Sequence, residues 1–159
     1  MDSEEILQKA LAFGEEGDWS GMVAELSDAL EAEPGDPAIL CWLGVAEGEL
    51  GLAGSSYERF KEALAGGPED PYILATVGNG LAHFDDPDAE GALRSASVMA
   101  PDLALARWLF GAYLSREGLF DDALRELRAA KELDPEDPVI AYELGVALVL
   151  QGKLEESLD

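Results

Sequence analysis

Four sets of residues recur along the chain at the same uneven spacing, and this recurrence constrains the fold more than any other feature. From each member to the next, the spacing is 34, then 33, then 34 positions. The sets are Pro34, Pro68, Pro101 and Pro135; Gly44, Gly78, Gly111 and Gly145; Ala29, Ala63, Ala96 and Ala130; and Leu26, Phe60, Leu93 and Leu127. Self-similarity with a period of about 20 to 50 residues indicates a repeat architecture.

The unit resembles the tetratricopeptide repeat (TPR), a family whose unit of about 34 residues is a helix, a turn and a second helix. The resemblance covers nearly the whole chain and implies one all-α domain over residues 1–159. It would be a right-handed superhelical solenoid of antiparallel helix hairpins, with four full repeats and a partial fifth. The repeats are expected at 3–36, 37–70, 71–103, 104–137 and 138–159.

Apolar periodicity and turn residues place the helices within each unit. In residues 71–84, for example, Leu74, Val77, Gly78 and Leu81 recur at the spacing of one helix face. Glycines at 17, 51, 118 and 152 are expected just past the end of a first helix, where a positive φ is often needed. Proline ends each unit because it cannot continue a helix, and it presets the first helical turn of the next unit. The helix pairs are predicted at 3–15 and 19–32, 37–50 and 54–66, 71–84 and 87–99, and 104–117 and 121–133, with a fifth first helix at 138–150.

Some positions depart from the pattern. Lys9, Glu47 and Arg107 are charged where apolar residues are expected, and repeat 3 lacks the turn glycine. Its corner contains Asp86-Pro87-Asp88-Ala89-Glu90-Gly91, which mimics the start of a calcium loop. The twelfth place holds Ser97 instead of Glu, so the preferred interpretation is Asp86 as a helix cap with Pro87 at the first helical position. No metal site is expected.

The charge of the chain is strongly acidic, with a net value of -24. Such a chain lacks the Lys/Arg patch that nucleic acid or an anionic membrane requires. The acidity suits either a basic partner or a salt-rich cytoplasm. Residues 1–36 carry 11 acidic residues and 1 basic residue, so the N-terminal end is the most negative surface. The start of the chain has no signal-peptide pattern, and a cytoplasmic location is expected.

The resemblance implies that the first helix of each repeat lines a concave groove. Family members that bind acidic chaperone tails use Lys, Asn and Arg on that face, but sixteen matching positions of repeats 1 to 4 hold no Lys or Arg. That ligand class is therefore rejected. The predicted groove is apolar and aromatic instead, with Asn79 able to hold a backbone amide. Its residues are Trp42, Tyr72, Asn79, Leu105, Trp108, Leu109 and Tyr142.

Core packing is the competing interpretation of these aromatic residues. Trp42 and Trp108 could equally lie between adjacent repeats, and Trp19, in the first turn, is interpreted as structural. Residues 138–150 are apolar on more than one face, which calls for burial. Either the chain is a piece of a longer repeat protein, which is the preferred interpretation, or two copies cover each other in a homodimer through helix 138–150.

The chemistry-bearing residues do not assemble into a catalytic motif. His83 is the only histidine and Cys41 the only cysteine, and no nucleophile–base set or phosphate loop is present. The sequence therefore predicts a non-enzymatic scaffold without cofactors that binds a peptide or helical segment of a protein partner, with a basic flank suiting the acidic half. The alternatives are a self-assembling structural module and a chaperone for an aggregation-prone client.

Overall fold

Helices account for almost all of the regular structure in a computed structural model that describes residues 2–158. Within those residues there are nine α-helices and no strand, which confirms the predicted all-α fold class. Met1 and Asp159, which the predicted domain includes, lie outside the described residues. The helices are α1 (Ser3–Glu15), α2 (Trp19–Ala32), α3 (Pro37–Glu49), α4 (Ala53–Ala65), α5 (Pro71–Ala82), α6 (Ala89–Met99), α7 (Ala104–Arg116), α8 (Phe120–Leu133) and α9 (Pro138–Leu158).

An Asp-Pro pair sets the start of α3, α5 and α9. The carboxylates of Asp36, Asp70 and Asp137 accept hydrogen bonds from backbone N–H groups in the first turn, at 2.8–2.9 Å for Ala38, Tyr72 and Val139. The proline that follows each Asp occupies a position where a missing N–H costs nothing. The ends of α1 to α8 all fall within two residues of the sequence prediction, and for the starts of α3 and α5 these local signals explain the agreement.

Consecutive helices pack as antiparallel hairpins, and a glycine in the first helix lets the second approach closely. A Cβ atom added to Gly44 would lie 2.8 Å from Phe60 Cε1, and one added to Gly111 would lie 2.7 Å from Leu127 Cγ. Both distances are shorter than any real carbon–carbon contact of this kind. The recurring glycines of the sequence are thus notches that receive a large apolar residue from the paired helix.

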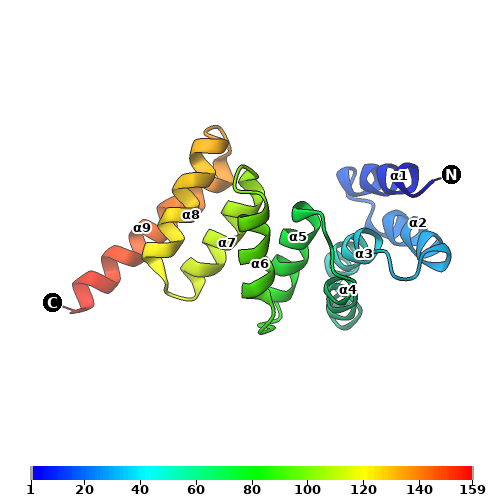
Figure 1. Cartoon of the computed structure of the whole chain (residues 1–159), viewed down its shortest axis with the longest axis horizontal. Helices are drawn as coiled ribbons and strands as arrows, with labels where there is room; N and C mark the ends of the chain where they lie inside the picture. Colours follow the sequence, from blue (N-terminus) through cyan, green and yellow to red (C-terminus); the bar gives the residue numbers. More distant parts are fainter. Residues whose placement is uncertain (1, 159) are drawn as a thin grey trace.

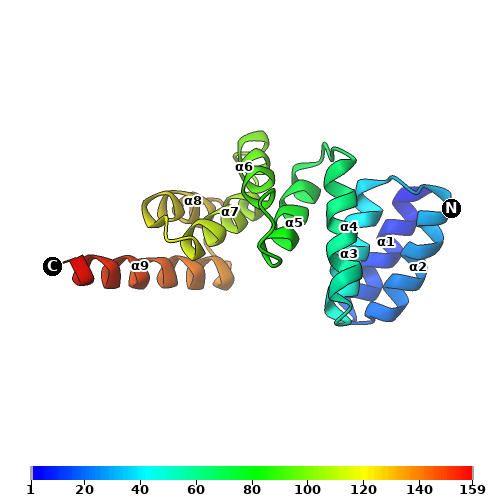
Figure 2. The ribbon, with the colours of Figure 1, turned by 90° about the horizontal axis from the view of Figure 1, so that it is seen from below.

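The hairpins stack into an elongated solenoid with the two chain termini at opposite ends (Figure 1). Along it, α3 packs against α5, α5 against α7, and α7 against α9. Figure 2 shows α1 to α4 side by side at the N-terminal end, and α9 extending from the other end. Because each hairpin buries its apolar surface against its neighbours, the core is a row of linked clusters along the axis.

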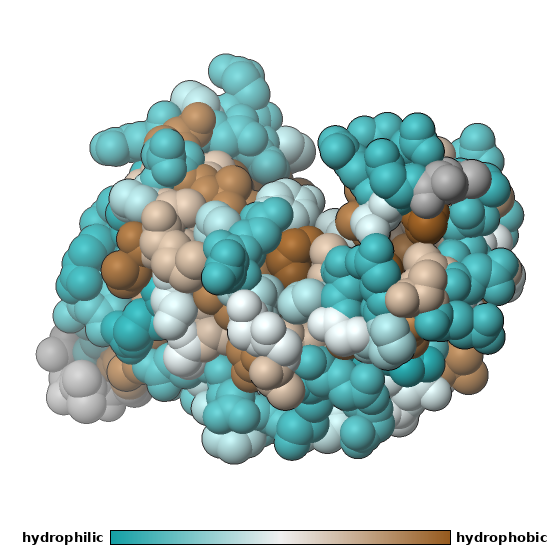
Figure 3. All heavy atoms as spheres, turned by 45° about the vertical axis from the view of Figure 1, so that its right-hand side comes forward, coloured by the Kyte–Doolittle hydropathy of each residue, from teal (hydrophilic) through white to brown (hydrophobic). Residues whose placement is uncertain are grey.

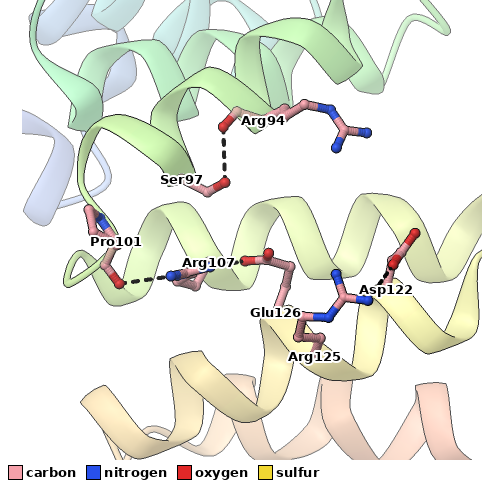
Figure 4. Close-up of polar contacts among 7 residues, drawn as sticks. All are labelled: Arg94, Ser97, Pro101, Arg107, Asp122, Arg125 and Glu126. Carbon is pink, nitrogen blue, oxygen red and sulfur yellow. Dashed lines mark hydrogen bonds and ion pairs between the residues drawn. The ribbon is translucent and has the colours of Figure 1, made fainter.

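Each charged residue that departs from the repeat pattern is paired with a charge on the second helix of its own hairpin. Lys9 Nζ lies 3.0 Å from Glu25 Oε2, and Arg107 Nη1 lies 2.9 Å from Glu126 Oε2. Figure 4 shows Arg107 reaching Glu126 on one side and the Pro101 carbonyl oxygen on the other. In the third pair, Glu47 with Arg59, the acidic side chain is more buried than in the other two pairs. The departures are therefore intra-hairpin ion pairs.

The corner of repeat 3 replaces the missing turn glycine with Asp85, whose φ is 54°. Aspartate tolerates this left-handed conformation better than most residues do. The next residue, Asp86, is buried and accepts a 2.5 Å hydrogen bond from the Tyr57 hydroxyl. Its other carboxylate oxygen accepts from the Asp88 N–H at 2.8 Å. Asp86 caps this turn, and α6 itself begins at Ala89, two residues later than the predicted start at Pro87.

Asp86 is expected to stabilise the fold in a pH-dependent way. The hydrogen bond from Tyr57 lowers the pKa of Asp86 below its ordinary value of 3.8. A carboxyl group whose pKa is lower in the folded state contributes stability above its unfolded pKa and loses it as the pH falls through the folded pKa. Asp86→Asn should therefore cost about 1–2 kcal/mol at pH 7 and less at pH 3, measured by urea unfolding.

Asp88→Asn provides the control for that measurement, because Asp88 is exposed and its side chain makes no cap hydrogen bond. Its effect should be small at both pH values. A cost of Asp86→Asn that stays the same at pH 7 and pH 3 would show that the ionised carboxylate is not what stabilises the corner.

The fifth first helix does not end where the sequence predicted. The expected helix 138–150 continues as α9 to Leu158, and Gly152 lies inside it. Gly17, Gly51 and Gly118 do adopt positive φ angles of 74°, 79° and 81°, but Gly152 does not. A glycine inside a helix costs only about 1 kcal/mol, and residues 2–158 contain no second helix of a fifth hairpin that would pack against α9 and stabilise a turn. The predicted turn at Gly152 is therefore wrong for this structure.

Candidate functional site

A groove opens between α1 and α3 at the N-terminal end of the solenoid. Its volume is about 580 Å³, and the first turn of α5 forms one end. Figure 3 shows this side of the molecule hollowed, with hydrophobic side chains inside the hollow and hydrophilic ones on its rims. The apolar and aromatic residues that line the groove are Leu7, Leu11, Trp19, Met22, Ala38, Trp42, Val45, Tyr72 and Ile73.

Trp42 and Tyr72 meet in this groove. Their ring centroids are 6.1 Å apart and their planes are tilted by 38°, an arrangement that aromatic pairs favour. Trp42 also packs against two core clusters, one of repeats 1 and 2 and one of repeats 2 and 3, so its ring is held in one place. Tyr72 is 42% exposed at the start of α5. The pair therefore presents an aromatic surface that is anchored in the core at Trp42 and open to solvent at Tyr72.

The charged residues on the groove are both acidic. Glu15 ends α1, and Asp70 caps α5 through the Tyr72 N–H. Lysine and arginine are absent from the lining residues that the structure describes. Since residues 1–36 carry a large excess of acid, the field around the groove favours a cation over an anion.

Four of the predicted groove residues lie farther along the solenoid. Leu109 is 7% exposed and belongs to the core cluster of repeats 3 and 4, where Leu105 also packs. Trp108 packs between that cluster and the cluster of α8 and α9. Its indole nitrogen is buried and has no hydrogen-bond acceptor among the described residues. Asn79 is half-buried on α5, where its backbone oxygen accepts a 2.8 Å hydrogen bond from His83 Nδ1.

The seventh predicted residue, Tyr142, is on α9 and is 69% exposed. It lines a separate shallow hollow of about 420 Å³ with Ala141, Gly145, Val146, Val149 and Leu150. The structure thus brings together Trp42 and Tyr72 from the predicted set, and it places Tyr142 at the opposite end of the molecule.

Residues of α1 and α2 complete the groove, although they are not among the predicted groove residues. Leu7 and Leu11 occupy the same repeat positions as Cys41 and Val45, so the repeat register could have indicated them. Trp19, interpreted as structural, both packs on the first core cluster and lines the groove. The sequence could not indicate that Trp19 lines the groove, because its exposure there depends on the distance between α1 and α3.

Antiparallel helix hairpins stacked through their first helices define this chain as a helical-repeat solenoid. Solved structures identify the kind of solenoid: the chain adopts the TPR fold. It is 22% identical to a thermophilic TPR protein of Thermus thermophilus, with a TM-score of 0.76, covering 99% of this chain and 87% of that one. It is 23% identical to YrrB, a TPR protein with an unusual peptide-binding site, with a TM-score of 0.68 and coverage of 95% and 78%.

A third similar structure is PilF of Pseudomonas aeruginosa, at 19% identity and a TM-score of 0.79, covering 94% of this chain and 69% of that one. Neither a protein-family model nor a curated protein matches the sequence. In the described part of the chain, no helix combines the length and apolar character needed to cross a membrane.

Proposed function

We propose that this chain is a non-catalytic scaffold that binds a peptide segment of a protein partner in the groove between α1 and α3. The observation that carries the proposal is the Trp42–Tyr72 pair, in which Trp42 is packed on the core and Tyr72 is partly exposed, within a hollow of about 580 Å³. Aromatic anchors in concave sites are typical of peptide recognition. The peptide-binding site of YrrB shows that a protein of similar fold can have this kind of function.

The ligand that suits this groove has an apolar or aromatic anchor next to a lysine or arginine. The anchor would bury against Trp42 and Leu11, and the cation would lie near Glu15 and Asp70. It stays a prediction that binding also involves Asn79, Leu105, Trp108 and Leu109. A cytoplasmic location stays a prediction as well. A chaperone function for an aggregation-prone client would use the same apolar groove.

Reversing the charge of Glu15 is expected to weaken binding of a basic peptide about tenfold, because attraction becomes repulsion at the groove wall. The probes would be peptides selected from a random display library panned against the full chain. We expect the selected sequences to combine an aromatic or large aliphatic residue with Lys or Arg. Affinities for Glu15→Lys and for the unaltered chain would be measured by fluorescence anisotropy at two salt concentrations.

Glu16→Lys is a matched control, since Glu16 is the next residue, is exposed and does not line the groove. It should change affinity much less than Glu15→Lys. Tyr72→Ala should remove binding while helical content by circular dichroism stays the same. Peptides that bind equally well to Tyr72→Ala and the unaltered chain would contradict the assignment of this groove.

Self-association is a second candidate function, favoured by the exposed apolar face of α9. Tyr142, Val149 and Leu150 are exposed on this helix although soluble proteins rarely leave such a patch uncovered. We propose that the face of α9 is an interface between copies of this chain, and analytical ultracentrifugation over a range of concentrations tests it.

A further inference from the structure

The repeat geometry shows what kind of element the exposed face of α9 would receive. Gly145 occupies the same repeat position as Gly44, Gly78 and Gly111, each of which is closely contacted by a large residue of the paired helix. A Cβ atom added to Gly145 would meet nothing within 4 Å. The same notch is therefore present on α9 but unfilled, and in the other hairpins its occupant is an antiparallel helix.

The helices that fill these notches share a pattern. Each carries a small residue, a large apolar residue four positions later and an alanine three positions after that. The triplets are Ser56, Phe60 and Ala63 in α4; Ala89, Leu93 and Ala96 in α6; and Ala123, Leu127 and Ala130 in α8. In the second hairpin the large residue Phe60 contacts Gly44, and the small residue Ser56 lies against Gly48, one turn later on α3.

Helix α9 has the glycine notch, and it also has the small–large–small triplet of the helices that fill such notches. Gly145, Val149 and Gly152 follow the same small, large, small spacing. If α9 pairs with an antiparallel copy in the register of the second hairpin, Val149 fills the Gly145 notch of the copy. By the same register, the Val149 of the copy fills the first chain's own notch. This reciprocity is the requirement for an interface with two-fold symmetry.

We infer that α9 pairs antiparallel with α9 of a second copy, with Val149 of each chain seated against Gly145 of the other. The inference rests on the proposed self-association and adds its register and residues. Tyr142, which is 69% exposed, would lie against Gly152 of the other copy. In the second hairpin the residues at the matching positions, Cys41 and Ala63, pack in one core cluster. The occupant of the exposed face is thus a second copy of this chain.

Electrostatics makes this pairing weak and dependent on salt. Each copy has a net charge of -24, so two copies repel each other at low ionic strength. Added salt shortens the range of this repulsion to about 10 Å at 0.1 M and about 3 Å at 1 M. One helix per copy gives a small interface, of the size found in transient complexes. The association constant is therefore expected to rise with salt concentration.

The first test fills the notch. Gly145→Leu should lower the association constant at least tenfold in sedimentation equilibrium at 0.5 M salt, because the added side chain occupies the place of the partner's Val149. The change should not harm the monomer, since the site is open and leucine favours helix. Gly91→Leu makes the same change on α6, also with nothing within 4 Å, and should leave association unchanged. Equal association of Gly145→Leu and Gly91→Leu would overturn the inference.

A cysteine pair tests the register separately from association itself. Cys41 is fully buried, so an introduced surface cysteine is the reactive one. Chains with Gly145→Cys and chains with Val149→Cys, distinguished by mass, would be mixed in a glutathione redox buffer. Random pairing in an equimolar mixture would give as much mixed disulfide as both homodimers together, so the mixed disulfide should exceed the sum of the two homodimers. Association that persists with a dominant Gly145→Cys homodimer would overturn the register alone, while a monomer at every concentration and salt would overturn self-association too. Neither result bears on the groove at α1 and α3.

Discussion

Replacing Phe60 by alanine is expected to lower the free energy of unfolding by about 3–5 kcal/mol, the largest effect of any single truncation we propose. Phe60 is 5% exposed, and its ring lies between Gly44 of α3 and Gly80 of α5. Cβ atoms added at these glycines would approach the ring to 2.8 Å and 2.5 Å. The ring therefore joins repeats 2 and 3, and its loss leaves a cavity that the two backbones can close only by moving together.

A double-mutant cycle tests whether Phe60 couples the two repeats. Gly80→Ala should cost about 1–3 kcal/mol in the unaltered chain, because the new methyl group overpacks against the ring. In a Phe60→Leu background the same change should cost clearly less. Urea unfolding followed by circular dichroism gives the energies, and hydrogen exchange in α3 and α5 shows where protection is lost. A cost of Gly80→Ala that is independent of residue 60 would contradict this account.

Much of the fold could be predicted because its determinants are local. Asp36-Pro37 and Asp70-Pro71 carry the cap and the first helical residue in adjacent positions, so the sequence alone locates α3 and α5. The end of α9 could not be predicted in this way. Gly17, Gly51 and Gly118 turn because a second helix packs behind them, and the sequence around Gly152 gives the same signal without that packing.

The candidate site could be predicted only in part. The repeat register puts Trp42 and Tyr72 on one concave face, and the structure has both lining the same hollow. The register treats all repeats alike, however, and so predicts that Trp108 lines the groove in the same way as Trp42. The structure separates them because Trp108 packs between two core clusters, whereas α1 and α3 are spaced so that a groove opens beside Trp42. That difference in helix spacing arises from tertiary packing and has no local signature.

The charged departures from the repeat pattern show a signal that sequence reasoning could have used. Lys9, Glu47 and Arg107 each have a residue of opposite charge at one fixed place in the following helix, namely Glu25, Arg59 and Glu126. In repeat 3 the first helix has no such charge, and the matching place holds Ala92. Charges that depart from a repeat in complementary pairs indicate an ion pair inside the hairpin.

Removing Arg59 is expected to be the most damaging change to these pairs. The Glu47 side chain is 7% exposed, and its Oε1 lies 3.4 Å from Arg59 Nε. Its Oε2 is buried and has no hydrogen-bond partner among the described residues. Arg59→Leu should therefore cost about 3 kcal/mol, because it leaves a buried carboxylate without the positive charge that it pairs with. Urea unfolding at pH 7 measures the loss.

The double change Glu47→Leu with Arg59→Leu should recover this loss and bring stability to or above that of the unaltered chain. Leucine already occupies the place of Glu47 in three other repeats, as Leu81, Leu114 and Leu148. An apolar pair avoids the cost of desolvating two charges, which often exceeds the attraction between them. Lys9→Leu is the comparison, because the Lys9 side chain is 51% exposed and its ion pair should contribute less than about 1 kcal/mol. If Arg59→Leu were no more costly than Lys9→Leu, burial of Glu47 would not be what makes its ion pair necessary.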